Sequence, residues 1–343
     1  MPARAPTLQT IADHIGCSKN TVSCALRNDS RISDRMKAEV RRVAKELGYR
    51  PNPLVSAHMQ SLRKSHPAKQ SATLAFLHTG VESDLWSRRK FSAELFRGAS
   101  ERASELGYHL TPVWAAEPGI SGERLGAILQ ARGVLGLLVP LVEDPQALKG
   151  LNWDEFASAA MGFSLTEPAL HSAATFYLHA IPDAGRMLMR AGNKRLGILF
   201  SPRLDARFDH AWEAGSAIAI RQCRDLKIPV TVLRKDYITP KALRNWLLRH
   251  RIEGLISVGN TNIFLAISDI RDDLPASFRH LSVLADEPEK TAGHVWGIYD
   301  RDLTGIGAAS VDLVVGQLYR NERGIPLKRK TLLIEGEWRI NEV

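Results

Sequence analysis

The pattern of apolar and polar positions predicts three short helices at the start of the chain. Thr7 can cap a helix in which apolar side chains recur every three or four residues. Gly16 ends this helix, because glycine adopts left-handed backbone conformations without strain, and Ser18 caps a second helix. A third helix is expected to begin at Ser33 and to end at Gly48. Three short helices with a tight corner between the first two predict a helix-turn-helix unit.

From residue 72 the pattern changes to apolar strands that alternate with amphipathic helices. The predicted strands include ATLAFLH, YHLTPVW, GVLGLLVP, RLGILF, IPVTVL, EGLISVG and HLSVLA. An irregular stretch follows GVLGLLVP, and a helical pattern resumes at 184–191. Such alternation predicts parallel sheets with helices on both faces. Because roughly 270 residues are too many for one such sheet, we expect two lobes.

Positive charge is concentrated in the first 65 residues. They hold twelve Lys and Arg but five Asp and Glu, whereas the rest of the chain holds 34 and 32. Such a concentration is typical of binding to a phosphate backbone, and a merely soluble basic segment is the alternative. Lys19 and Asn20 open the second helix, which in a helix-turn-helix enters the major groove. Lys can donate to guanine and Asn can pair with adenine; a three-helix unit used for protein contacts is the alternative.

Composition and motifs bound the class of protein. With 44% hydrophobic and 24% charged residues, the chain is typical of soluble globular proteins, and no apolar run is long enough to make a membrane a partner. Three cysteines without a Cys-x-x-Cys pair favour a cytoplasmic protein without disulfides. The common nucleotide-binding, metalloprotease and nucleophile-elbow motifs are absent from the sequence, so we expect no catalytic residues, cofactor or metal. The alternative left open is a small-molecule-binding or enzymatic α/β protein with a fused DNA-binding domain.

Two stretches of the chain, TLQTIADHIGCSKNTVSCALRN and RISDRMKAEVRRVAKELGYRPNP, closely resemble the N-terminal domain of the LacI/GalR family of transcription regulators. The resemblance implies a small all-α helix-turn-helix domain at 1–50, a hinge helix and linker at 51–71, and a two-lobed α/β core of the periplasmic-binding-protein type I kind at 72–343. It further implies a DNA-binding repressor that forms a homodimer through its core and responds to a small polar effector such as a sugar. The expected DNA-contacting residues are Thr7, Ser18, Lys19, Asn20, Thr21, Ser23, Cys24, Asn28, Arg50, Asn52, Ala57, His58 and Met59.

The DNA-contacting region departs from the family at two positions. Family members commonly carry an arginine where this chain has Cys24, on the expected outward face of the second helix, so we expect a different operator sequence. Their hinge helix wedges a leucine into the minor groove and kinks the duplex, and His58 occupies this position. A wedge supplied by Met59 or Leu62, or a weaker kink, are the alternatives.

The resemblance also implies an effector site in the cleft between the lobes. Open α/β sheets bind ligands beyond the carboxyl ends of their strands, so residues just after predicted strands are candidates. Asn260 occupies the family's sugar-contacting Asn-Asp pair, although Thr261 replaces the aspartate, and Trp212 replaces a sugar-gripping arginine. The effector is left open between a sugar, another polar metabolite and no ligand at all, and packing is the alternative role for each candidate. The candidates are His78, Trp86, Phe163, Trp212, Asn260, Asp286 and Arg301.

Overall fold

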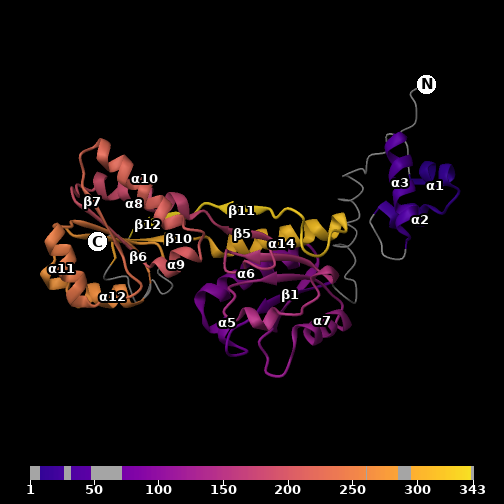
Figure 1. Cartoon of the computed structure of the whole chain (residues 1–343), viewed down its shortest axis with the longest axis horizontal. Coiled ribbons are helices and arrows are strands. Elements are labelled where there is room, and N and C mark those ends of the chain that lie inside the picture. Colours follow the sequence, from indigo (N-terminus) through magenta and orange to yellow (C-terminus); the bar gives the residue numbers. More distant parts are fainter. Residues whose placement is uncertain (1–7, 27–31, 48–71, 260, 285–294, 341–343) are drawn as a thin grey trace.

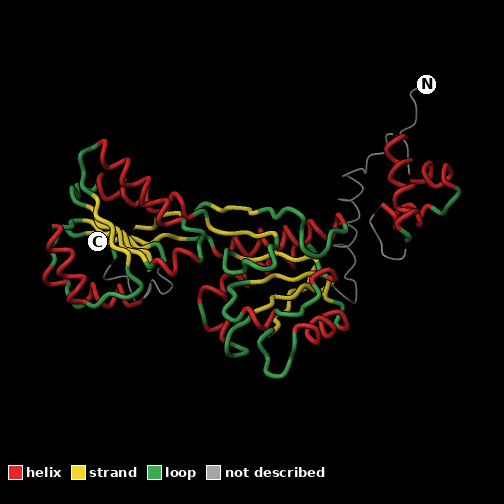
Figure 2. Tube along the Cα trace, in the orientation of Figure 1, coloured by secondary structure: helices red, strands yellow, loops and turns green. Residues whose placement is uncertain are grey.

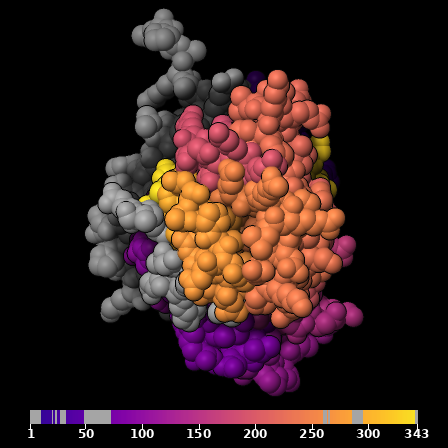
Figure 3. Space-filling view, turned by 90° about the vertical axis from the view of Figure 1, so that its left-hand side faces the viewer, coloured from indigo at the N-terminus to yellow at the C-terminus, as the bar shows by residue number. Residues whose placement is uncertain are grey.

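The computed structural model describes residues 8–26, 32–47, 72–259, 261–284 and 295–340. These residues form a three-helix domain and a larger core of two lobes (Figure 1). Figure 2 shows that each lobe is built on its own sheet, and Figure 3 looks onto the outer surface of the second lobe. Among the described residues, no helix is long and apolar enough to cross a membrane.

The N-terminal domain has the three helices and the corner that the sequence predicts. Gly16 lies in the left-handed region, with φ of 75°, and the Ser18 hydroxyl accepts a hydrogen bond of 3.0 Å from the Thr21 amide. The Ser33 hydroxyl caps the third helix in the same way. The expected cap at Thr7 and the expected end at Gly48 lie outside the described residues. The helices are α1 (Leu8–Ile15), α2 (Lys19–Leu26) and α3 (Asp34–Glu46), and their shared core is formed by Ile11, Ala12, Val22, Ala25, Val40, Val43 and Ala44.

The first lobe is a six-stranded parallel sheet whose last strand comes from near the end of the chain. In sheet order, its strands are β11 (Thr331–Ile334), β5 (His171–Thr175), β4 (Ala157–Met161), β3 (Val134–Val139), β1 (Ala72–His78) and β2 (Tyr108–Trp114). Apolar side chains of α6 (Lys90–Glu105) and α14 (Leu303–Arg320) cover one face, and those of α7 (Gly122–Ala131) cover the other. The short helix α5 (Leu85–Arg88) precedes α6.

Helices α6 and α14 of the first lobe approach each other closely at two glycines. A Cβ atom on Gly98 would overlap the backbone of Thr304, and one on Gly307 would overlap the backbone of Leu95. Because glycine has no side chain, the two helices can pack backbone against backbone. This contact fixes α14, which follows directly on a connection from the second lobe.

The second lobe repeats the architecture of the first. In sheet order, its strands are β12 (Glu337–Ile340), β10 (Gly297–Asp300), β9 (Arg279–Ser282), β8 (Gly254–Val258), β6 (Leu196–Phe200) and β7 (Val230–Arg234), and only β12 is antiparallel to its neighbour. Helices α8 (Ala180–Arg190) and α10 (Ala211–Asp225) pack on one face, and α11 (Pro240–His250) and α12 (Thr261–Ser268) pack on the other. The short helix α9 (Pro202–Ala206) follows β6.

The chain passes between the lobes three times in the described residues, as the resemblance implied. The connections follow β5, β10 and β11. Each of these strands leaves its sheet from its carboxyl end toward the other lobe. The carboxyl edges of the two sheets therefore face each other across the space between the lobes (Figure 1).

The sequence reading missed two strands of the first lobe. Strands β4 (ASAAM) and β5 (HSAAT) lie in the stretch after GVLGLLVP for which the sequence predicts no regular element, and α8 begins at Ala180, earlier than expected. Both strands are fully buried and consist mainly of alanine, serine and threonine. Small residues without alternation give no period-two signal, because neither face of these strands is exposed to water.

Candidate functional site

The N-terminal end of α2 presents polar and positively charged groups. Lys19 is the first residue of the helix and is exposed, and it forms no ion pair with any residue that the structure describes. The Ser18 and Thr21 hydroxyls lie 2.8 Å apart beside it. Asn20 and Ser23 lie on the same helix. A helix end with a free ammonium group and a capping hydroxyl is suited to contact a nucleic acid.

Cys24 does not lie on the outward face of α2, so that prediction was wrong. Its side chain is only 6% exposed. Helix α2 packs against both α1 and α3, and it therefore buries a wider arc than the stripe of residues that the helical period suggests. The remaining predicted DNA-contacting residues lie outside the described residues: Thr7, Asn28, Arg50, Asn52, Ala57, His58 and Met59.

Two of the predicted effector-binding residues meet at the carboxyl edge of the first lobe. His78 is the last residue of β1, and its ring centroid lies 6.2 Å from that of Trp86, which packs on Phe96 at 4.5 Å. His78 is only 4% exposed, and its Nδ1 atom has no hydrogen-bond partner among the described residues. Burial lowers the pKa of His78 to about 4, so the ring is neutral at neutral pH.

Phe163 and Arg301 lie beside an apolar pocket near the connections between the lobes. The Arg301 guanidinium carbon lies 5.2 Å from the centroid of the Phe91 ring, and the Thr175 hydroxyl donates a hydrogen bond of 3.1 Å to the Arg301 carbonyl. Arg301 is 8% exposed. We call this space the hinge pocket; it is lined by Phe91, Leu95, Met161, Gly162, Phe163, Ala174, Thr175, Tyr177, Phe208, Leu303 and Ile306.

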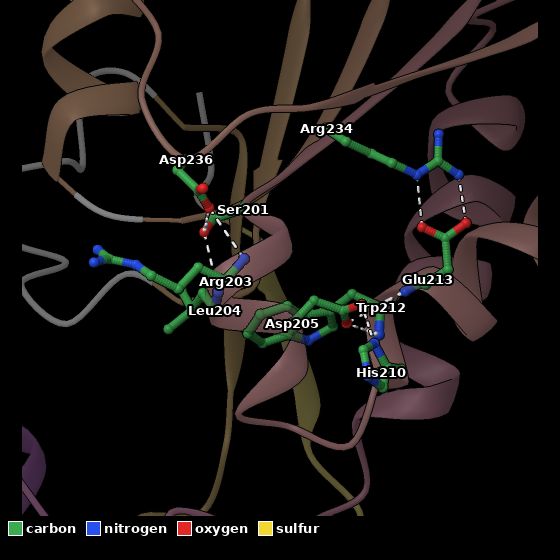
Figure 4. Close-up of polar contacts among 9 residues, drawn as sticks. All are labelled: Ser201, Arg203, Leu204, Asp205, His210, Trp212, Glu213, Arg234 and Asp236. Carbon is green, nitrogen blue, oxygen red and sulfur yellow. Dashed lines mark hydrogen bonds and ion pairs between the residues drawn. The ribbon is translucent and has the colours of Figure 1, made fainter.

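Trp212 is a core residue of the second lobe. Its side chain is fully buried, and its ring packs on Phe208 at 4.7 Å and on Tyr177 at 5.9 Å between centroids. The Trp212 amide donates a hydrogen bond of 2.9 Å to the buried Asp205 carboxylate, which holds the start of α10 (Figure 4). Of the two roles that the sequence left open for Trp212, the structure shows packing. Asn260 and Asp286 lie outside the described residues.

A second pocket, which the sequence reading missed, lies at the carboxyl ends of β6, β7 and β8. The Ser201 hydroxyl donates a hydrogen bond of 2.6 Å to Asp236 Oδ1, and the Arg203 amide donates one of 3.0 Å to the same atom (Figure 4). These bonds, led by that of Ser201, hold the pKa of Asp236 below its usual range. We call this space the basic pocket; it is lined by Ser201, Arg203, Leu204, Arg207, Lys235, Asp236, Tyr237, Ile238, Gly259 and Ile263.

A signal for the basic pocket was present in the sequence. Arg203 is the third residue after the predicted strand RLGILF, and Lys235 is the second after IPVTVL, so the rule that ligands bind beyond strand ends applies to them. In the second lobe the same rule selected Asn260 and Asp286, which follow the predicted strands EGLISVG and HLSVLA, but not Arg203 and Lys235.

Similarity to known proteins identifies the N-terminal domain. Residues 7–52 match the family model described as bacterial regulatory proteins, lacI family. The N-terminal domain belongs to the lacI family. Over 201 residues the chain is 29% identical to the HTH-type transcriptional regulator MalR of Streptococcus pneumoniae, and the match covers 56% of each protein. The chain is also 28% identical over 136 residues to the regulator CelR of Thermobifida fusca, covering 40% of this chain and 37% of CelR. The chain thus spans about half of the length of MalR and little more than a third of that of CelR.

Solved structures share the fold of the whole chain, including both the N-terminal domain and the core. A complex of the transcriptional regulator CelR with cellobiose has a TM-score of 0.57 at 19% identity, and 98% of both chains are covered. A Lac repressor dimer bound to operator and the anti-inducer ONPF has a TM-score of 0.54 at 16% identity, again with 98% of both chains covered. A helix-turn-helix domain followed by a two-lobed α/β core is therefore the fold of this protein.

Proposed function

We propose that this protein is a sequence-specific DNA-binding transcriptional regulator, of the repressor type, that is controlled by a small polar effector. The observation that carries the proposal is the lacI-family domain at residues 7–52, with Lys19 exposed at the start of α2. The relatives are named as transcriptional regulators, and the two-lobed core offers pockets on the facing edges of its sheets.

The proposal distinguishes residues that read bases from residues that anchor the backbone. Replacing Asn20 with alanine should relax the preference at one base position and cost about 1–3 kcal/mol on the best site. Replacing Arg50 with alanine should instead weaken all sequences alike and reduce the salt slope by about one unit. The measurement is selection from randomised duplexes, followed by affinity titrations at several salt concentrations.

A control for net charge is Arg224→Ala. Arg224 is exposed at the end of α10 in the second lobe, so its loss should change neither base preference nor salt slope. An unchanged site preference in Asn20→Ala would show that α2 does not read bases.

We further propose that the protein binds a near-palindromic site as a homodimer. One helix-turn-helix contacts few bases, and two-fold pairing doubles the contacts. Sedimentation without DNA should give a dimer at micromolar concentration. A monomer under these conditions would contradict the proposal.

Control by an effector requires that a ligand bind two arrangements of the lobes with different affinity. A ligand between the facing sheet edges contacts both lobes and meets this requirement. A thermal-shift screen should find it, because a ligand that binds only the folded state raises the melting temperature. The ligand must also change the affinity of the protein for its operator. A ligand that stabilises the protein without changing operator affinity would favour the alternative of a small-molecule-binding or enzymatic protein with a fused DNA-binding domain. Turnover of that ligand by the purified protein tests the enzymatic alternative.

A further inference from the structure

The basic pocket lies at the edge of the second lobe's sheet that faces the first lobe. It lies at the carboxyl ends of β6, β7 and β8, and the carboxyl edge of this sheet is the edge from which β10 crosses to the first lobe. The segment that follows β6 joins the two pockets, because Arg207 lines the basic pocket and Phe208 lines the hinge pocket. A ligand in the basic pocket is thus placed on the side of the second lobe that faces the first.

The pocket has an excess of positive charge that nearby carboxylates do not neutralise. Arg203, Arg207 and Lys235 line it, and none of them forms an ion pair with a residue that the structure describes. The pocket's carboxylate, Asp236, already accepts hydrogen bonds from the Ser201 hydroxyl and the Arg203 amide. In Figure 4 the Arg203 guanidinium extends away from this pair of residues.

Two other arginines of the same lobe each bind a carboxylate with two nitrogens. Arg234, the residue before Lys235, binds the Glu213 carboxylate with both Nε and a terminal nitrogen (Figure 4), and Arg244 binds Asp273 in the same manner. The pocket cations differ from these two arginines because three of them line one pocket and no carboxylate among the described residues forms an ion pair with them. Unpaired cations gathered in one pocket can donate hydrogen bonds to a ligand.

The backbone that carries these cations is held in place. The Leu204 amide donates a hydrogen bond of 3.1 Å to the Ser201 hydroxyl, and Asp205, which is 2% exposed, accepts one from the Trp212 amide. The cationic groups therefore need little reorganisation to bind a ligand, which favours affinity. Tyr237 and Ile263 add apolar surface to the same pocket.

We propose that the basic pocket binds a carboxylate or phosphate group of the effector, so that the effector is an organic anion such as a sugar acid or a sugar phosphate. That the ligand acts as an effector rests on the proposed function, whereas anion binding in the basic pocket does not depend on DNA binding. Arg203 and Lys235 supply charge and hydrogen-bond donors, and the apolar part of the pocket contacts the carbon skeleton.

The test uses the full chain and inorganic phosphate, titrated against chloride at equal ionic strength. Phosphate should raise the melting temperature of the wild type more than chloride does. In the double variant Arg203→Gln/Lys235→Gln, phosphate affinity should fall by about tenfold or more, since the variant loses two charged hydrogen-bond donors to the anion. The matched control Arg224→Gln/Lys227→Gln removes two exposed cations at the end of α10 and should respond like the wild type.

Comparison of the double variant with the matched control is needed because phosphate bound by the basic N-terminal domain would stabilise all these proteins alike. Equal phosphate responses in the wild type and in Arg203→Gln/Lys235→Gln would overturn the proposal, as would a wild type that phosphate stabilises no more than chloride. Neutral sugars, their aldonates and their phosphates then form three arms of a screen on operator affinity. Hits among aldonates or among phosphates identify the anionic group, whereas a neutral hit unaffected by the double variant contradicts the proposal. Loss of all DNA binding in the wild type would overturn the proposed function and leave the phosphate result standing.

Discussion

The two lobes have the same strand order but different chemistry at the edges that face each other. In the first lobe this edge carries the buried His78 and the Trp86 ring, and Arg88 and Arg89 in its loops are paired with carboxylates. In the second lobe it carries Arg203 and Lys235. Because the topology is shared, the difference arises from the few residues that follow each strand. Topology thus fixes where a ligand can bind, and these loop residues decide which ligand it is.

Each lobe also contains a buried histidine, and the two histidines differ in their hydrogen bonding. In the second lobe, the buried His280 accepts or donates a hydrogen bond of 2.7 Å with the Ser257 hydroxyl. In the first lobe, Nδ1 of the buried His78 has no partner among the described residues. An unsatisfied buried polar atom costs folding free energy, and the second lobe also holds such atoms, among them Trp212 Nε1 and Ser216 Oγ.

The largest expected effect comes from the aromatic core of the second lobe. Replacing Trp212 with alanine should lower the free energy of unfolding by about 3–5 kcal/mol, because it leaves a cavity between Phe208 and Tyr177. Urea unfolding followed by circular dichroism measures the change.

Trp212→Phe is the control that separates packing from ligand binding. It keeps an aromatic ring and removes an indole nitrogen that has no partner among the described residues, so it should cost much less than alanine. Full stability in both variants together with weakened effector binding would instead restore the sugar-stacking role.

An intermediate effect is expected from His78 in the first lobe. Its folded-state pKa, about 4, lies below its unfolded value of about 6.5, so the unfolded chain binds the proton more readily. Stability is therefore unaffected above pH 6.5 and falls as the pH decreases toward 4, by about 3 kcal/mol from this group. The measurement is urea unfolding of the wild type and His78→Gln between pH 7 and pH 4.5.

The difference between the two pH profiles isolates His78 from the other titrating groups. His78→Gln should lose less stability on acidification than the wild type. Parallel profiles would mean that the pKa of His78 is the same in the folded and unfolded protein, which would contradict the effect of its burial.

Local signals in the sequence were sufficient for the N-terminal domain. The Gly16 corner and the Ser18 and Ser33 caps are short-range features, and the structure confirms all three. Cys24 was misplaced because α2 packs against both α1 and α3, a tertiary arrangement that the helical period of α2 alone does not show. The alternating pattern also predicted the two-lobed core, since exposed and buried faces leave a period in the sequence.

Features that depend on distant parts of the chain were not predictable from local pattern. Strands β4 and β5 are buried on both faces, and β11, which pairs with β5, lies more than 150 residues later. Trp212 lies in the first turn of α10, where its amide donates a hydrogen bond to Asp205, and its ring packs against Tyr177, which precedes α8. The family pattern gave it a role in the cleft, but side-chain packing decided the outcome.

The smallest expected effects concern one exposed ion pair in each lobe. Arg234 pairs with Glu213 between β7 and α10, and Arg89 pairs with Glu143 in the first lobe. Double-mutant cycles with glutamine should give coupling energies below about 1 kcal/mol for both pairs, because exposed charges are well solvated in the unfolded chain and screened by salt. The Arg234 pair should have the larger coupling, since both Nε and a terminal nitrogen bind the carboxylate. Coupling in 0.5 M salt should shrink for both. A larger coupling for the Arg89 pair would contradict this ranking and would mean that burial of the carboxylate, 28% exposed in Glu143 and 45% in Glu213, outweighs the two-nitrogen geometry.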